Sequence, residues 1–204
     1  MAAARLPSAE AAIDATSALL EGGVSVMEFS MTMPDALEAI RRVTTHLGDR
    51  VLVGAGTVLD AETARATILA GAQFVVSATI SAGVIEMAHR YSRACIPGAL
   101  SPTEILLASE LGADLVKVFP AGNMGPDYIR AVLAPLCDVS LMVDGGVTLD
   151  NAQDFIRAGA VALGVGRCLV DFQAVKAGRY EKLTDLARRF VAAVREARAE
   201  ARQG

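Results

Sequence analysis

The residues GADLVKVFPA (112–121) show the pattern from which the fold is predicted. A glycine and a small residue precede a short apolar run, and Lys117 interrupts that run with an ammonium group. The same form recurs in GGVSVMEFS (22–30), GAQFVVSAT (71–79) and GAVALGVG (159–166). The repeats begin roughly forty to fifty residues apart, which is the length of about two βα units.

Three further apolar runs lie between the repeats and are bounded by glycine or proline: VLVGAGTV (51–58), ACIPGAL (94–100) and SLMVDGGV (140–147). Together the runs predict seven strands. The stub Met1–Ala4 would make eight, but alanine is a weak strand former. We therefore expect a short or irregular first strand and a thin seam between strands one and eight.

The connecting stretches are typical of amphipathic helices, because they open on Ser, Thr, Asp or Pro and close on glycine. They include residues 7–23, 60–72, 101–113 and 149–160, and a charged helix is predicted over Tyr180–Gln203. Alternating helices and apolar strands indicate a parallel sheet covered by helices. We predict an α/β protein with a (β/α)8 TIM barrel in one domain, residues 1–204. An open doubly wound sheet is the alternative.

The composition excludes several classes of protein. Of 204 residues, 53% are hydrophobic and 21% charged, and the net charge of −4 comes without a basic stripe, so a nucleic-acid partner is not expected. No apolar run approaches the length of about 18 residues typical of a membrane span, and the N-terminus lacks a signal-peptide pattern. We expect a cytoplasmic protein without a membrane partner. Cys95, Cys137 and Cys168 are expected to be reduced core thiols rather than metal ligands.

Two ionisable residues interrupt strands that are otherwise apolar, Glu28 after VSVM and Lys117 after DLV. In a barrel, side chains at the carboxyl ends of strands face the active site. A buried charge must be paired, so one interpretation is a structural ion pair between Glu28 and Lys117. In the other, the lysine loses its proton in an apolar cavity and attacks a ketone to form a Schiff base. A nearby carboxylate would then shuttle protons, and no cofactor is needed.

Glycine-rich turns follow the last two predicted strands, in VDGGV (143–147) and GVGR (164–167). Backbone N–H groups at such turns, followed by helix N-termini, commonly bind phosphate in barrels. Arg167 would add a positive charge facing the same anion. The alternative is that these glycines only end their strands tightly.

Taken together, these motifs resemble the 2-keto-3-deoxy-6-phosphogluconate (KDPG) and 4-hydroxy-2-oxoglutarate (KHG) aldolase family. The resemblance covers about residues 5–170 and lies in GGVSVMEFSMTMPDA, VGAGTV, IPGALSPTE, KVFPAG, GGVTLDN and AGAVALGVG. It implies a class I aldolase on a (β/α)8 barrel, assembled as a homotrimer. The substrate of such an enzyme is a small molecule, a 2-keto-3-deoxy (phospho)sugar acid or 4-hydroxy-2-oxoglutarate. The enzyme cleaves it to pyruvate and an aldehyde without a cofactor or metal.

The same resemblance implies roles for eight residues, and Asp144 and Arg167 stand beside them in the sequence. Lys117 would form the Schiff base and Glu28 would be the general acid and base. The residues that would bind or contact the substrate are Arg5 on the carboxylate, Thr57 on the pyruvate part, Phe119 beside the lysine, Gly145, Gly146 and Gly166 in the phosphate loops, and Asp144 and Arg167 at the acceptor end.

Asp144 and Arg167 depart from the family pattern, which usually has threonine and serine at these two positions. A carboxylate at position 144 would repel a phosphate unless it pairs with Arg167. A phosphosugar epimerase or decarboxylase-like barrel is the alternative function, but its metal chemistry needs strand-end histidines, which this sequence lacks. A non-catalytic metabolite-binding barrel is a third possibility.

Overall fold

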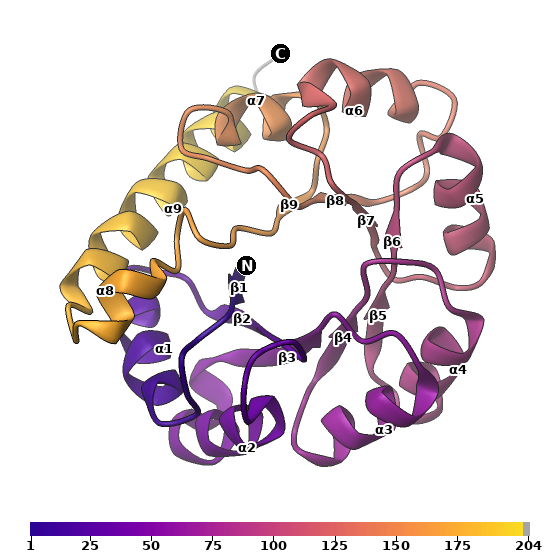
Figure 1. The fold of residues 1–204 in the computed structure, drawn as a ribbon. Coiled ribbons are helices and arrows are strands. Elements are labelled where there is room, and N and C mark those ends of the chain that lie inside the picture. The colour runs from indigo at the N-terminus through magenta and orange to yellow at the C-terminus, as the bar shows by residue number, and fades with distance from the viewer. Residues whose placement is uncertain (202–204) are drawn as a thin grey trace.

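The computed structural model describes residues 1–201, which form a ring of strands surrounded by helices (Figure 1). The strands are β1 (Ala2–Ala4), β2 (Val26–Ser30), β3 (Leu52–Gly56), β4 (Phe74–Val76), β5 (Ala94–Ile96), β6 (Gly98–Ala99), β7 (Val116–Val118), β8 (Leu141–Val143) and β9 (Ala162–Leu163). The helices are α1 (Ala11–Glu21), α2 (Ala36–Leu47), the 3-10 turn η1 (Gly48–Arg50), α3 (Ala61–Leu69), α4 (Ala82–Arg90), α5 (Pro102–Glu110), α6 (Gly125–Leu133), α7 (Ala152–Arg157), α8 (Phe172–Lys176) and α9 (Glu181–Ala201).

Neighbouring strands pair in parallel in the order of the chain, as a (β/α)8 barrel requires. β5 and β6 are two parts of one strand interrupted at Pro97, which has no N–H to donate. β5 pairs with β4, and β6 pairs with β7. Counting β5 and β6 as one, the ring has the eight predicted strands.

The ring closes between the first and last strands. β1 pairs with β2 on one side, and on the other Ala2 forms a parallel bridge with Val165, where the Ala3 N–H donates to the Val165 carbonyl at 2.9 Å. This closure confirms the barrel, and the open doubly wound sheet is wrong. The first strand is three residues long, so the prediction of a short strand and a thin seam is confirmed.

Two helices begin on a polar side chain where the sequence predicts. Asp60 accepts the N–H of Thr63 at the start of α3, and Ser101 forms a reciprocal capping box with Glu104 at the start of α5. α1 begins at Ala11, four residues later than predicted. The predicted end of the last helix at Gln203 lies outside the described residues.

A small apolar cluster, separate from the main core, is formed by residues of β4, β5 and β8: Phe74, Val76, Ile96 and Met142. The main core packs the helices onto the outside of the ring. Because Met142 is in register with Lys117, this cluster gives the lysine an apolar neighbourhood.

Two of the three thiols are not where they were expected. Cys95 is buried, and burial raises its pKa to about 12, but Cys137 and Cys168 are exposed. The prediction of core thiols is therefore wrong for the last two, which lie outside the helices and strands. Among residues 1–201, no helix is long and apolar enough to cross a membrane.

Candidate active site

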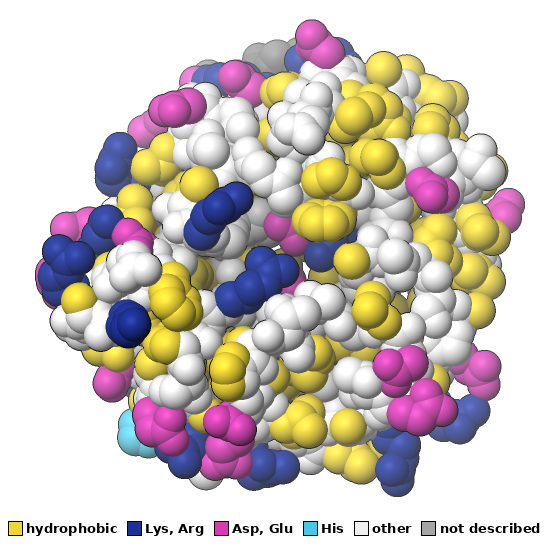
Figure 2. Space-filling model, in the orientation of Figure 1, with side chains coloured by type: hydrophobic (Ala, Val, Ile, Leu, Met, Phe, Trp, Pro, Cys, Tyr) yellow, Lys and Arg dark blue, Asp and Glu magenta, His cyan; other side chains and the backbone are white. Residues whose placement is uncertain are grey.

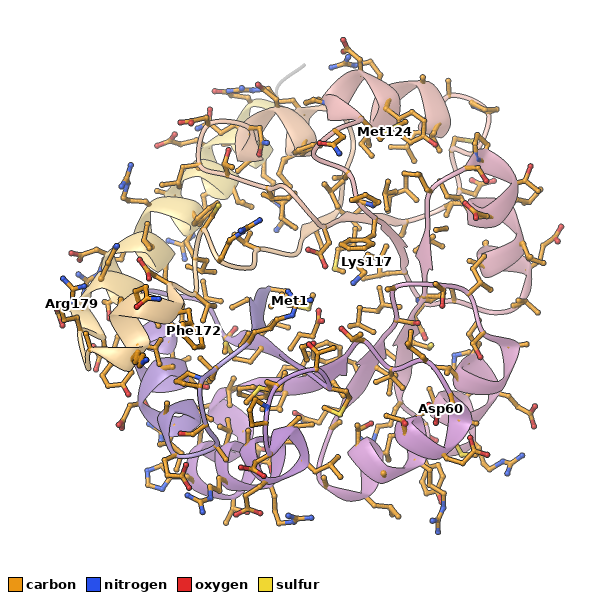
Figure 3. All side chains as sticks on the ribbon, in the orientation of Figure 1. Met1, Asp60, Lys117, Met124, Phe172 and Arg179 are labelled. Carbon is orange, nitrogen blue, oxygen red and sulfur yellow. The ribbon has the colours of Figure 1, made fainter. Side chains whose placement is uncertain are left out.

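Lys117 is the middle residue of β7 and is buried inside the ring. Its side chain is 6% exposed and lies within the circle of strands (Figure 3). Its in-register neighbours are Gly98 on β6 and Met142 on β8. A side chain at Gly98 would collide with the backbone of Ala78, so this position needs glycine.

The carboxylate that pairs with Lys117 belongs to Asp144, which directly follows β8. Lys117 Nζ lies 3.1 Å from Asp144 Oδ2, and the Gly145 N–H donates to Asp144 Oδ1 at 2.6 Å. A Cβ at position 164 would lie 2.9 Å from Asp144 Cγ, so Gly164 makes space for this carboxylate. The alternative of a Glu28–Lys117 ion pair is wrong, and Asp144 does not pair with Arg167.

Glu28 faces the same interior from β2. It is 4% exposed, and within the described part of the chain its Oε2 has no hydrogen-bond partner. A Cβ at position 56 would lie 1.6 Å from Glu28 Oε1, so the site requires Gly56. Burial raises the pKa of Glu28 to about 7, and the nearby Lys117 charge opposes that rise. The carboxyl can therefore both donate and accept a proton near neutral pH.

A chain of hydroxyl groups leads from the rim of the barrel toward Glu28. Ser30 Oγ lies 2.8 Å from Thr32 Oγ1 and 3.0 Å from Thr57 Oγ1, and Arg5 Nε donates to Thr32 Oγ1 at 3.3 Å. Thr57 has a φ of 58°, an uncommon conformation for a β-branched residue. Ser30 shares a face of β2 with Glu28, because alternate residues of a strand point the same way. These groups offer several donors to one carboxylate.

The turn after β8 needs glycine for close packing of two backbones. Gly145 and Gly146 have φ values of 77° and 97°, and the Gly122 N–H donates to the Gly145 carbonyl at 2.6 Å. A Cβ at Gly146 would lie 2.6 Å from the Gly122 Cα. At Gly166 the nearest such atom is the Ala3 carbonyl oxygen at 3.8 Å, so glycine is not required there.

Phe119 connects this turn to the lysine. Lys117 Nζ lies 5.0 Å from the centre of the Phe119 ring, within the range of a cation–π contact. Arg167 is exposed on the loop after β9. Figure 2 shows that the centre of this face is hollowed, with basic side chains beside acidic atoms.

The model of the family "KDPG and KHG aldolase" matches residues 1–186. The chain belongs to that family. It is 35% identical over 182 residues to a 2-dehydro-3-deoxy-6-phosphogalactonate aldolase of Escherichia coli K12, covering 88% of this chain and 86% of the relative. Among solved structures, a native KDPGal structure is 33% identical with a TM-score of 0.89, covering 96% of this chain and 94% of the other.

An engineered relative also has this fold. A cube-shaped, porous protein cage designed by fusing symmetric oligomeric domains is 33% identical, with a TM-score of 0.91 over 99% of this chain and 74% of the cage chain.

The structure brings most of the predicted site residues to one end of the ring, with Arg5 and Arg167 exposed. Sequence reasoning missed Ser30, Gly56 and Gly164. Ser30 could have been found from its position two residues after Glu28. His46 and His89 lie on α2 and α4, away from the strand ends. A separate cavity of about 320 Å³ lies between α9 and the first residues of β2 and β9, and none of the predicted site residues lines it.

Proposed function

We propose that the chain is a class I aldolase that cleaves a 2-keto-3-deoxy sugar acid, or 4-hydroxy-2-oxoglutarate, to pyruvate and an aldehyde. The observation that carries the proposal is the buried Lys117 amine, ion-paired with Asp144 and facing the same interior as the Glu28 carboxyl, whose Oε2 has no hydrogen-bond partner among residues 1–201. An amine and proton-transfer groups held together in a mostly apolar site are what Schiff-base catalysis needs.

The first half of the reaction forms the covalent intermediate. The Lys117 ammonium gives a proton to a carboxylate, and the free amine adds to the substrate C2 carbonyl carbon. The resulting carbinolamine loses its hydroxyl as water when Glu28 donates a proton, leaving an iminium. With its pKa near 7, Glu28 is protonated in a large fraction of molecules at neutral pH.

The second half breaks the C3–C4 bond. A carboxylate accepts the C4 hydroxyl proton, the bonding pair moves to C3, and the iminium becomes an enamine while the aldehyde leaves. Protonation of C3 and addition of water then release pyruvate and the free lysine. Glu28, ionised after its first proton transfer, is the proposed base of this half.

The substrate carboxylate is proposed to bind at Arg5 and Thr57, whose hydrogen-bonded chain passes through Thr32 and Ser30. Phe119 would pack beside the reacting carbon. The other end of the substrate would then extend toward the loops after β8 and β9, where Gly145, Gly146, Gly166 and Arg167 are the proposed contacts.

Reduction with borohydride in the presence of pyruvate tests the proposal. We expect one reduced pyruvate adduct per chain, mapped to Lys117 by peptide mass spectrometry, and none in Lys117→Arg. A wild-type chain that stays unmodified at saturating pyruvate would overturn the proposal.

We also infer a homotrimer located in the cytoplasm. Support for an assembly comes from exposed leucines, because Leu106 and Leu107 on α5 and Leu111 directly after it are 44%, 45% and 38% exposed. Hydrophobic side chains gather over α5 and α6 on the face seen in Figure 2. Light scattering should give three times the chain mass for the wild type and a lower mass for Leu107→Lys. A monomeric wild type would contradict this assembly.

A further inference from the structure

Asp144 places a carboxylate in the loop after β8, where the acceptor half of the substrate is proposed to lie. Its Oδ1 accepts the Gly145 N–H at 2.6 Å, and its Oδ2 lies 3.1 Å from Lys117 Nζ. A backbone N–H at a glycine turn and a nearby ammonium are groups that would otherwise attract an incoming anion. In this chain a buried carboxylate already engages both.

The proposed direction of the bound substrate brings its acceptor half close to Asp144. The substrate carboxylate is proposed to bind at Arg5 and Thr57, which follow β1 and β3. Lys117 would hold C2 through its Nζ. Asp144 lies 3.1 Å from that atom and directly after β8, so its carboxylate is within reach of the groups that the substrate carries beyond C2.

We infer that Asp144 makes this site select an uncharged, hydroxyl-bearing acceptor half, so that the substrate is an unphosphorylated 2-keto-3-deoxy sugar acid. The inference rests on the proposed aldolase function. Because a phosphate monoester brings a charge of about −1.5 to −2, it meets a like charge at Asp144. A sugar hydroxyl instead donates a hydrogen bond to the carboxylate.

Asp144 keeps the capacity to accept such hydrogen bonds. A carboxylate has about four lone-pair sites, and the Gly145 N–H and Lys117 use two of them. When the imine forms, the lysine nitrogen has fewer N–H groups, so more of that capacity becomes available to substrate hydroxyls. Imine formation therefore increases the number of hydrogen bonds that Asp144 can accept from the acceptor half of the substrate.

Arg167 is the group that would favour a phosphate. It is exposed on the loop after β9, and within residues 1–201 it has no carboxylate within 4.0 Å. The interaction of an exposed charge with the substrate is weakened by water and by dissolved salt. The interaction of a buried charge is screened about fourfold less. The buried Asp144 therefore outweighs the exposed Arg167, and the net effect on a phosphate is repulsion.

The test compares acceptors in the synthetic direction, with pyruvate as donor and D-glyceraldehyde or its 3-phosphate as acceptor. We expect wild-type kcat/KM to favour the unphosphorylated aldehyde by at least about tenfold. Asp144→Asn, which removes the charge at constant size, should lower that preference about tenfold or more. Asp144→Ser is the second variant in case the first does not fold. Arg167→Gln is the matched control, and its preference for the unphosphorylated aldehyde should change less than that of the Asp144 variants.

A wild type that prefers the phosphorylated aldehyde would overturn the inference, and so would an unchanged preference in folded Asp144 variants. Borohydride trapping with pyruvate alone involves no acceptor half. Trapping without the expected preference therefore disproves the role of Asp144 while leaving the aldolase proposal intact, and absence of trapping disproves the aldolase itself.

Discussion

Lys117 Nζ and Asp144 Oδ2 lie 3.1 Å apart, and both side chains are buried at the end of the barrel that holds the proposed site. Each is the counter-charge of the other. Removing one partner of a buried pair leaves an unpaired charge in a poorly solvated position, which is more costly than removing both.

Lys117→Met is therefore expected to lower the free energy of unfolding by about 3 kcal/mol, because it leaves the Asp144 carboxylate unpaired. Lys117→Arg keeps a cation and should lose less stability, yet it cannot form an imine because a guanidinium stays protonated. Urea unfolding of both variants, with the borohydride assay on the arginine variant, checks this. Equal stability of the methionine variant and the wild type would show that the pair contributes nothing.

Glu28→Gln should slow turnover by roughly 10² to 10⁴, because an amide cannot exchange the protons that dehydration and cleavage require. Some imine should still form with pyruvate. The wild-type pH profile of kcat/KM should show an inflection near pH 7 from Glu28, and the variant should lack it. Persistence of the same inflection would assign it to another group.

Glu28→Gln should also change how stability depends on pH. The pKa of Glu28 rises from an ordinary value of 4.5 to about 7 on folding, so the folded chain binds more protons between those values. Wild-type stability then falls as pH rises from 4.5 to 7. One pKa unit corresponds to about 1.4 kcal/mol. The free energy of unfolding of the variant should therefore exceed that of the wild type by about 3 kcal/mol above pH 7, and the two should not differ from this cause below pH 4.5. Urea unfolding at pH 5 and pH 8 measures the gain, and a constant difference would refute it.

Gly146→Ala should destabilise the fold by about 3 kcal/mol, because it combines a positive φ with a methyl group 2.6 Å from the Gly122 Cα. Gly166→Ala is the matched control. Its nearest atom is 3.8 Å away, so its stability should stay within about 0.5 kcal/mol of the wild type. Thermal unfolding distinguishes the two, and similar melting temperatures would contradict the packing of these turns.

Thr57→Gly should relieve a strained φ and remove the hydroxyl from the proposed carboxylate site. We expect stability within about 1 kcal/mol of the wild type and a pyruvate concentration for half-maximal trapping about tenfold higher. Thr57→Val keeps the strain and loses the same hydroxyl, so it should match the glycine variant in trapping but melt at a lower temperature. Unchanged trapping in both would remove Thr57 from the site.

The fold could be predicted from the sequence because its signals are local. Glycine-bounded apolar runs marked the strands, and Asp60 and Ser101 marked helix starts that the structure confirms. Lys117 and Glu28 stood out because each interrupts an apolar run. The partner of Lys117 could not be predicted this way, because it depends on which side chains meet across the ring. Asp144 directly follows the neighbouring strand, β8. Because Gly164 has no side chain, the Asp144 carboxylate has space to lie beside the lysine.

Pairing of the strands is interrupted at two places, at Pro97 between β5 and β6 and at the single bridge between Ala2 and Val165. The backbone still bonds across both places, because the Lys117 N–H donates to the Pro97 carbonyl at 2.8 Å and the Val165 N–H donates to the Met1 carbonyl at 3.0 Å. Glu28 lies on one side of these places, among β1 to β5, whereas Lys117 lies on the other side, among β6 to β9, with Asp144 directly after β8. A change in strand separation at either place would alter the distance between the Glu28 carboxyl and the Lys117 amine, but it would leave the amine beside Asp144. Proton transfer by Glu28 would therefore be more sensitive to such a change than the charge neutralisation of Lys117.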